Sequence, residues 1–247
     1  MTRTLLLLHG FTGSHDAWAE HRLAFEREFD LLAPDLPGHG ASPEAASVEA
    51  TADGLARQLG GSRAHVLGYS LGARIALRLA VAHPEVVDRL VLESPSAGIA
   101  DDAEREARRH ADVQLAEDIE RDGIEAFVDR WERNPVFTSH AALDPAVAAR
   151  QRAVRLAHDP LGLAQSLRLA GQGAMQPLHT QLREIRRPTL VVVGALDPAR
   201  PRAEDVADGI PAALLAVVDG AGHTPHLERP DAFRRLVIEF LLEDAVA

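Results

Sequence analysis

The feature that most constrains this chain is the pentapeptide G-Y-S-L-G at residues 68–72. A short apolar run, residues 64–67, precedes it, and the run that follows places Ile75 and Leu79 four residues apart. This spacing is typical of a packed helix, and the preceding run is typical of a buried strand. Glycines on both sides of a serine permit a very tight turn. A serine on a sharp strand-to-helix turn is presented as a nucleophile, so the context favours that role for Ser70 over an ordinary Gly/Ser turn.

Composition narrows the class of protein. The chain has 247 residues, of which 46% are hydrophobic and 26% charged, which fits one α/β domain with an insertion. The formal net charge of −11 argues against general nucleic-acid binding, and the lack of cysteine excludes disulfides and thiolate chemistry. No apolar stretch approaches membrane-spanning length, and the apolar residues 4–8 are too few for a signal peptide. We therefore expect a cytoplasmic protein with no nucleic-acid or membrane partner, as a monomer or small homo-oligomer.

Alternating strand-like and helix-like runs predict the architecture. Helices are expected at residues 48–59 and 231–242, and a helix or irregular crossover at residues 17–29. Such alternation predicts a mostly parallel sheet with helices on both faces. Strands are expected at residues 5–8, 31–33, 64–67, 86–92, 189–193 and 214–218.

The middle of the chain has a different pattern. From residue 101 to about residue 175 it is charged and helical, with no strand-like run. We interpret residues 99–177 as a helical cap inserted into a core made of residues 1–98 and 178–247. In open parallel sheets ligands bind beyond the carboxyl ends of the strands, where such a cap would lie.

A serine hydroxyl is a weak nucleophile or base unless a carboxylate-held imidazole activates it. Asp197 follows the predicted strand 189–193, and His223 lies on a Gly-rich loop after the predicted strand 214–218. Asp219 lies too close to His223 in the chain to face its ring easily. We therefore predict Ser70, Asp197 and His223 as a catalytic triad. The alternatives are a turn-capping role for Asp197 and a backbone-bonded loop position for His223.

Arg74 stands one helical turn after Ser70. A cation near a helix N-terminus opposes the helix dipole, so Arg74 is easier to explain as an anion contact than as a stabilising choice. The alternative is a partly buried arginine paired with a carboxylate at the sheet end.

His223 and His226 lack a third ligand at metal-binding spacing, so no metal site is predicted. No cofactor is predicted either.

The motifs at residues 9–14, 35–40, 68–74 and 222–223 resemble the α/β-hydrolase superfamily. Its order of triad residues is Ser, Asp, His, as in this chain. Further segments resemble one family within it, the 2-succinyl-6-hydroxy-2,4-cyclohexadiene-1-carboxylate synthases of menaquinone biosynthesis. These segments are residues 92–99, 123–137, 162–168 and 171–177.

The resemblance implies a lyase rather than a hydrolase. The implied reaction removes pyruvate from 2-succinyl-5-enolpyruvyl-6-hydroxy-3-cyclohexene-1-carboxylate, a small anionic tricarboxylate. Ser70, activated by His223, would take a proton from the ring carbon beside the succinyl carbonyl. The backbone N–H groups of Phe11 and Leu71 would form the oxyanion hole, which suits the charge that develops on the carbonyl oxygen.

The resemblance also implies substrate-binding residues. Three arginines match family positions that bind carboxylates, and Tyr69 and Trp131 match pocket residues; from its position alone, Trp131 is equally a core residue of the cap. Guanidinium groups suit this task because they grip carboxylates with two hydrogen bonds. The match is ungapped for Arg74, whereas Arg105 and Arg109 are rivals of Arg108, and Arg152 is a rival of Arg155.

Two departures from the family pattern stand near the triad: Ala73 replaces a usual glycine, and residues 198–199 replace a usual charged-aromatic pair. The first is a small change, whereas the second leaves the shape of the loop after Asp197 open. Two other functions compete with the lyase: a carboxylesterase or C–C bond hydrolase, and a non-catalytic binding module on the same fold.

Overall fold

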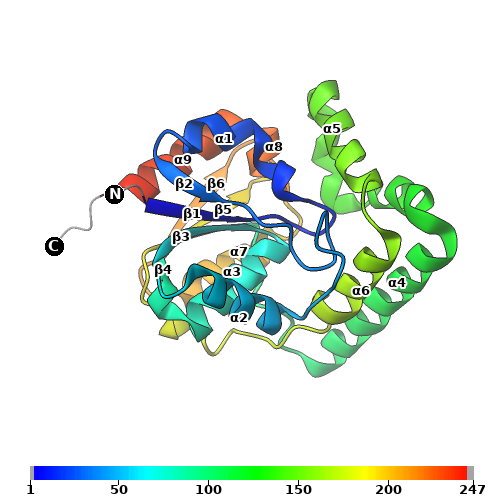
Figure 1. Ribbon diagram of the computed structural model, residues 1–247, viewed down its shortest axis with the longest axis horizontal. Coiled ribbons are helices and arrows are strands. Elements are labelled where there is room, and N and C mark those ends of the chain that lie inside the picture. Colours follow the sequence, from blue (N-terminus) through cyan, green and yellow to red (C-terminus); the bar gives the residue numbers. More distant parts are fainter. Residues whose placement is uncertain (1–2, 244–247) are drawn as a thin grey trace.

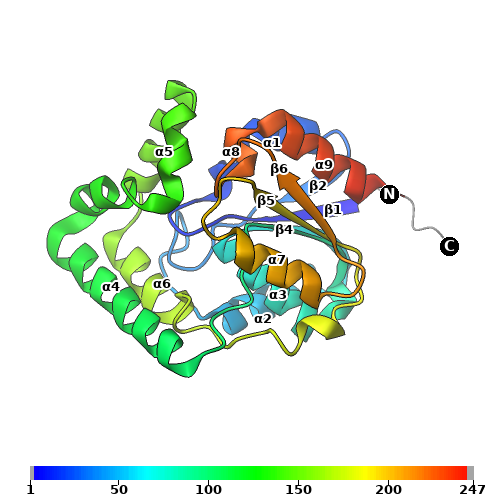
Figure 2. The same ribbon diagram turned by 180° about the vertical axis from the view of Figure 1, so that it is seen from behind.

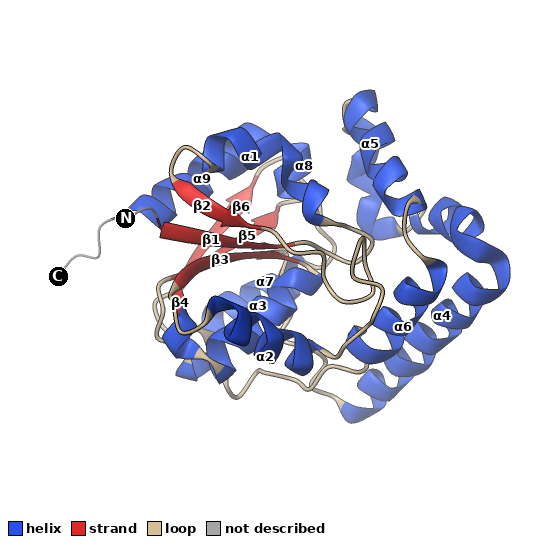
Figure 3. Cartoon of the chain, viewed as in Figure 1, coloured by secondary structure: helices blue, strands red, loops and turns tan. Residues whose placement is uncertain are grey.

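The computed structural model describes residues 3–243, so the outermost residues of the expected core, 1–2 and 244–247, lie outside the described part. Its centre is a six-stranded sheet in the order β2-β1-β3-β4-β5-β6 in which every neighbouring pair is parallel (Figure 3). The predicted parallel sheet is confirmed, with each strand within two residues of its expected bounds. The strands are β1 Arg3–Leu8, β2 Phe29–Leu32, β3 Ala64–Tyr69, β4 Val87–Glu93, β5 Thr189–Gly194 and β6 Leu214–Val218.

Helices cover both faces of the sheet, as predicted. One face carries α2, α3 and α7, and the other carries α1 and α9, with the short α8 beside them (Figures 1 and 2). All six residues of β3 are buried, as expected for a strand covered on both sides. The bounds are α1 Ala19–Phe25, α2 Val48–Leu59, α3 Leu71–Ala82, α7 Arg200–Gly209, α8 Pro225–Glu228 and α9 Pro230–Leu242.

Helix α2 shows how local sequence determines an element of this layer. The Ser47 side chain accepts a hydrogen bond from the Ala50 N–H and so caps the first turn. Val48, Ala52, Leu55 and Leu59 are buried on one side of the helix, and Gly60 ends it in the left-handed conformation (φ 58°). The predicted and observed bounds of this helix agree because its N-cap serine, its buried apolar residues and its terminal glycine all lie in the local sequence.

Between β4 and β5 the chain is helical and lies beyond the carboxyl ends of the strands (Figure 1). We call residues 99–177 the helical insertion. Its long helix bends at Gly123 (φ 80°), a backbone conformation that suits glycine. Ile119, Phe127, Leu163 and Leu167 form a small core of its own. The bounds are α4 Asp102–Trp131, α5 Pro145–Leu156 and α6 Pro160–Ala170, with a 3₁₀ segment at Pro135–Ala142.

Candidate active site

Ser70 occupies the sharp turn between β3 and α3 that the sequence predicts. Its backbone lies at φ 51° and ψ −104°, outside the regions that L-residues usually adopt. Both neighbouring glycines are sterically required. A Cβ at Gly68 would collide with the backbone of Gly72, and a Cβ at Gly72 would collide with the backbone of Leu8. The local sequence thus holds the serine in a strained turn at the edge of the sheet where the strands end.

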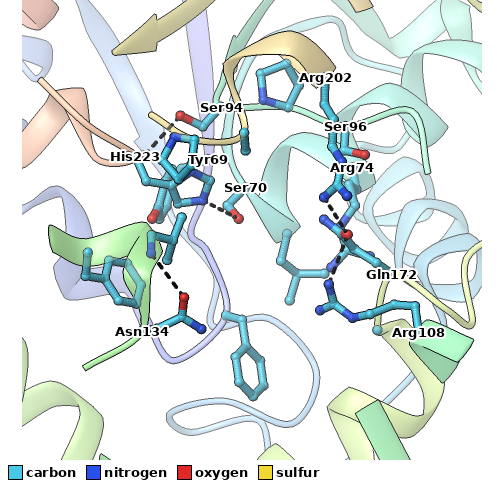
Figure 4. Close-up of a pocket in the computed structure, with 18 of the residues that line it drawn as sticks. Tyr69, Ser70, Arg74, Ser94, Ser96, Arg108, Asn134, Gln172, Arg202 and His223 are labelled. Carbon is cyan, nitrogen blue, oxygen red and sulfur yellow. Dashed lines mark hydrogen bonds between the residues drawn. The ribbon is translucent and has the colours of Figure 1, made fainter. Parts of the chain in front are cut away.

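The structure brings Ser70, His223 and Asp197 into one hydrogen-bonded chain (Figure 4 labels Ser70 and His223). His223 Nδ1 donates to Asp197 Oδ2 at 2.8 Å, which leaves Nε2, 3.3 Å from Ser70 Oγ, as the acceptor for the serine hydroxyl. Asp197 is 4% exposed, and its Oδ1 accepts the Ala199 N–H at 2.8 Å. Burial alone raises the pKa of Asp197, but the hydrogen bond and charge of His223 and the Ala199 N–H bring that pKa below its usual value. The carboxylate that orients His223 is therefore Asp197 rather than Asp219.

A buried glutamate that sequence reasoning missed holds the loop of His223 from both sides. Glu228 Oε2 accepts the Gly222 N–H at 2.7 Å, and its Oε1 accepts the Thr224 N–H at 3.0 Å and the Thr224 hydroxyl at 2.8 Å. The same hydroxyl lies 2.7 Å from His140 Nε2, in the 3₁₀ segment of the helical insertion. Burial alone raises the pKa of Glu228, but these hydrogen bonds bring that pKa below its usual value. The glutamate lies five residues beyond His223, a spacing that carries no signal without the folded loop.

Next to the triad lies a cavity of about 580 Å³ between the sheet edge and the helical insertion. Its wall near Ser70 is apolar and includes Phe11, Trp131 and Phe137. Trp131 packs on Phe127 of the insertion core with ring centroids 5.6 Å apart, and on Phe11 at 5.3 Å. Trp131 is therefore both a core residue of the insertion and a wall of the cavity, the two alternatives that its sequence position left equal.

The other side of the cavity is cationic (Figure 4). Arg74 is 7% exposed, donates to the Ala170 carbonyl at 2.7 Å and has no ion pair among residues 3–243. Burial lowers the pKa of Arg74 to about 10, so it stays charged at neutral pH. Arg108 also lines the cavity, and its Nε donates to Asp112 at 2.8 Å. The pairing of Arg74 with a sheet-end carboxylate, the alternative from sequence, is therefore not observed.

Arg155, the third predicted carboxylate-binding arginine, does not line this cavity. Its guanidinium lies 5.4 Å from the centre of the Phe137 ring and donates to Glu132 at 3.0 Å. Arg155 and its rival Arg152 instead face a neighbouring hollow of about 530 Å³. Phe137 belongs to the lining of both spaces, and Arg155 also lines a small third hollow together with Phe11 and Tyr69.

Phe11 and Leu71, the predicted oxyanion-hole residues, both line the cavity beside Ser70. Leu71 is the first residue of α3, so its N–H has no acceptor within the helix. A buried histidine supports the loop that carries Phe11: His9 Nε2 accepts the Leu36 N–H at 2.9 Å, and its Nδ1 donates to the Gly10 carbonyl at 2.8 Å. Burial lowers the pKa of His9 to about 4, so this bridge is neutral at physiological pH.

Three further polar residues line the cavity, and the sequence assigned them no role: Asn134, Gln172 and Arg202. Arg105 and Arg109, the rivals of Arg108, are absent from its lining.

Within residues 3–243 no group of three or more histidine, aspartate or glutamate side chains is placed to hold a metal ion. In the same part of the chain no helix combines the length and the apolar character needed to cross a membrane.

Comparison with known proteins decides the family. The model of the alpha/beta hydrolase fold family matches residues 3–230. The chain belongs to the alpha/beta hydrolase fold family. This agrees with the parallel sheet, with the strained Ser70 turn and with the order of Ser70, Asp197 and His223 along the chain.

Within the alpha/beta hydrolase fold family, three similar proteins are informative. A Bacillus subtilis (strain 168) protein provisionally named 2-succinyl-6-hydroxy-2,4-cyclohexadiene-1-carboxylate synthase is 36% identical, over 97% of this chain and 90% of its own. MenH from S. aureus superposes with a TM-score of 0.93 at 32% identity, over 98% of this chain and 94% of its own. A Rhizobium rhizogenes (strain K84 / ATCC BAA-868) protein provisionally named carbamate hydrolase RutD is 31% identical, over 97% of this chain and 92% of its own. The resemblance to the synthases is thereby confirmed, and hydrolases of the same fold are also similar.

Proposed function

We propose that this protein is the lyase that eliminates pyruvate from 2-succinyl-5-enolpyruvyl-6-hydroxy-3-cyclohexene-1-carboxylate, giving 2-succinyl-6-hydroxy-2,4-cyclohexadiene-1-carboxylate. The observation that carries the proposal is the two-sided cavity (Figure 4). Ser70 and His223 lie on one side, and on the other lies the buried cation Arg74, which has no ion pair within the described residues. A substrate with three carboxylates and one acidic C–H bond needs both sides. The similarity to a relative named for this synthase activity supports the same conclusion.

In the proposed mechanism the triad acts as a base. His223 Nε2 takes the Ser70 hydroxyl proton while Asp197 stabilises the imidazolium through Nδ1. Ser70 Oγ then removes the proton from the ring carbon beside the succinyl carbonyl, and the electron pair moves onto the carbonyl oxygen. The Phe11 and Leu71 N–H groups stabilise this oxyanion. When the enolate collapses, the ring C–O bond breaks, and the departing enolpyruvate takes up the proton held by His223 Nε2 to become pyruvate, which restores the triad.

The cation Arg74 argues against the competing hydrolase function. An esterase for neutral substrates would gain nothing from a buried guanidinium in the cavity wall, because burying a charge without a counter-charge is costly. A bound carboxylate would compensate that cost through charge-assisted hydrogen bonds. The carbamate hydrolase relative keeps a hydrolase as the second candidate, and the triad geometry alone does not separate the two.

We extend the proposal to the domain organisation of the protein, its cofactor requirement, its cellular location and its oligomeric state. Residues 99–177 act as a cap over a core of residues 1–98 and 178–247, and the cap supplies Arg108 and Trp131 to the cavity. The elimination is redox-neutral, so the reaction requires no redox cofactor. The protein acts in the cytoplasm on a small-molecule substrate, as a monomer or small homo-oligomer.

The test compares two substrates for the purified protein. We expect kcat/KM for pyruvate release from the tricarboxylate to exceed kcat/KM for hydrolysis of a p-nitrophenyl ester by at least about 10²-fold, since carboxylate contacts contribute binding energy only to the first. Pyruvate is measured by a coupled dehydrogenase assay and p-nitrophenol by absorbance. A higher kcat/KM for the ester would overturn the lyase proposal in favour of the hydrolase.

Replacing Glu228 tests the support of the His223 loop. Glu228→Gln keeps the shape but substitutes an amide donor for one of the two oxygens that accept the Gly222 and Thr224 N–H groups. We expect kcat to fall by about 10- to 100-fold with KM nearly unchanged, because a small displacement of His223 weakens proton transfer without touching the arginines. Glu239→Gln, at an exposed position on α9, is the matched control. An equal loss in both variants, or none in Glu228→Gln, would contradict a positioning role.

A further inference from the structure

The cavity contains a third guanidinium, from a residue outside the motifs that carry the family resemblance. Arg202 lies in the first turn of α7, five residues after Asp197, and lines the same cavity as Arg74 and Arg108. The loop that leads to it contains Pro198 and Ala199, where this chain departs from the family pattern, and both residues also line the cavity. The departure from the family pattern therefore lies in the lining of the cavity.

A single neutral oxygen connects two of these cations. Gln172 Oε1 accepts hydrogen bonds from Arg108 Nη1 at 3.2 Å and from Arg202 Nη1 at 3.3 Å. The amide thus holds a guanidinium of the helical insertion and one of the core near the same point, as Figure 4 shows. Because an amide carries no charge, this contact positions the two cations without neutralising either of them.

Few carboxylates balance the charge on this side. Asp112 pairs with Arg108 at 2.8 Å and also accepts the Gly173 N–H, so its hydrogen-bonding capacity is largely used. The acidic partner of Arg202 is Glu104, at 3.9 Å and with a side chain that is 62% exposed. An exposed pair at that separation is weak and is easily replaced by a bound anion. Three arginines therefore face the cavity with one closely paired carboxylate among them.

We propose that Arg202 binds a carboxylate of the substrate, beside Arg74 and Arg108. This inference rests on the proposed function, since it assumes a substrate with several carboxylates. Arg155, in contrast, is paired with Glu132 and is absent from the lining of this cavity. The Arg202 side chain is 44% exposed, and its hydrogen bond to the uncharged Gln172 amide fixes its orientation. Three arginines of this cavity, Arg74 and Arg202 of the core and Arg108 of the insertion, thus face the substrate.

The test removes Arg202 and measures recognition rather than chemistry. In Arg202→Ala we expect KM for the tricarboxylate to rise about fivefold with kcat little changed, as expected for a half-exposed charged contact. The dependence of KM on ionic strength should weaken, because one screened attraction is lost. Arg202→Lys should restore part of the loss, since it keeps the charge but not the planar fork.

Arg200→Ala is the matched control on the same helix. Arg200 Nε donates to Glu204 at 2.7 Å, and the residue does not line the cavity. A KM for Arg202→Ala equal to that of Arg200→Ala would overturn the inference. So would a rise in KM with an unchanged salt dependence, because such a rise would come from altered packing at the start of α7.

A binding measurement separates this inference from the proposed function. Calorimetric titration of the tricarboxylate into Ser70→Ala protein, with and without Arg202→Ala, reports recognition without turnover. A several-fold weaker Kd in the double variant supports the role of Arg202, and an equal Kd contradicts it. Absence of pyruvate release by the unmodified protein would instead contradict the proposed lyase function and leave the comparison of Kd values to judge Arg202.

Discussion

Ser70→Ala should lower kcat for pyruvate release by at least about 10³-fold, since the proposed base is removed while the oxyanion donors and the arginines remain. The substitution deletes one oxygen and one hydrogen bond, that between Ser70 and His223 Nε2. Alanine has the same backbone preferences as serine at φ 51°, so the strain of the turn stays the same. Substrate binding should therefore survive. The measurements are the steady-state rate of pyruvate release and the calorimetric Kd for the tricarboxylate.

Two controls accompany this variant. The thermal unfolding midpoint should stay close to that of the unmodified protein, because the deleted hydroxyl belongs to a partly exposed side chain at the cavity. Hydrolysis of a p-nitrophenyl ester should fall together with pyruvate release if both use the same serine. Retained turnover of the tricarboxylate in a folded Ser70→Ala protein would show that Ser70 is not the base.

Arg74→Ala should lower kcat/KM for the tricarboxylate by about 10- to 100-fold, the range expected when a charged group loses its hydrogen-bonded partner in a buried site. Both parameters should change: KM rises because a carboxylate contact is lost, and kcat falls because the substrate is held less firmly against Ser70. Kinetics of a small neutral ester should change little, since its binding does not use the cation. The selectivity between the two substrates is the deciding measurement.

Arg78→Ala, one helical turn farther along α3, is the matched control because its side chain does not line the cavity. Loss of the hydrogen bond between Arg74 and the Ala170 carbonyl also loosens the contact between α3 and α6. A variant that loses both activities equally would therefore identify Arg74 as a structural link between the core and the insertion rather than a substrate contact.

Much of the core was predictable because its signals are local. The apolar runs of β1, β3 and β5 are short and continuous, as expected for strands buried on both faces, and α2 carries its own cap and stop. Ser70 was predictable for the same reason, since its glycines, the preceding strand and the following helix are all neighbours in sequence. The match to the alpha/beta hydrolase fold family confirms the predicted fold.

The cationic side of the cavity was less predictable because its residues come from separate elements. Arg108 and Arg109 are adjacent in sequence, and only the rotation of α4 against α6 decides that Arg108 faces the cavity. Arg155 matches a carboxylate-binding position of the family through a gapped alignment, yet it is absent from the lining of the cavity and lies over the Phe137 ring. Nothing local to Arg202 marks it as a neighbour of Gln172, which lies 30 residues earlier in the chain.

The sequence by itself determined the parallel sheet, the strained turn of Ser70 and the identities of Asp197 and His223, because strand periodicity, glycine sterics and loop position are short-range properties. Only the tertiary structure decided that Glu228 holds both sides of the His223 loop. It also decided which arginines face the cavity. Both are long-range properties, because they depend on how helices of the core and of the insertion pack against one another.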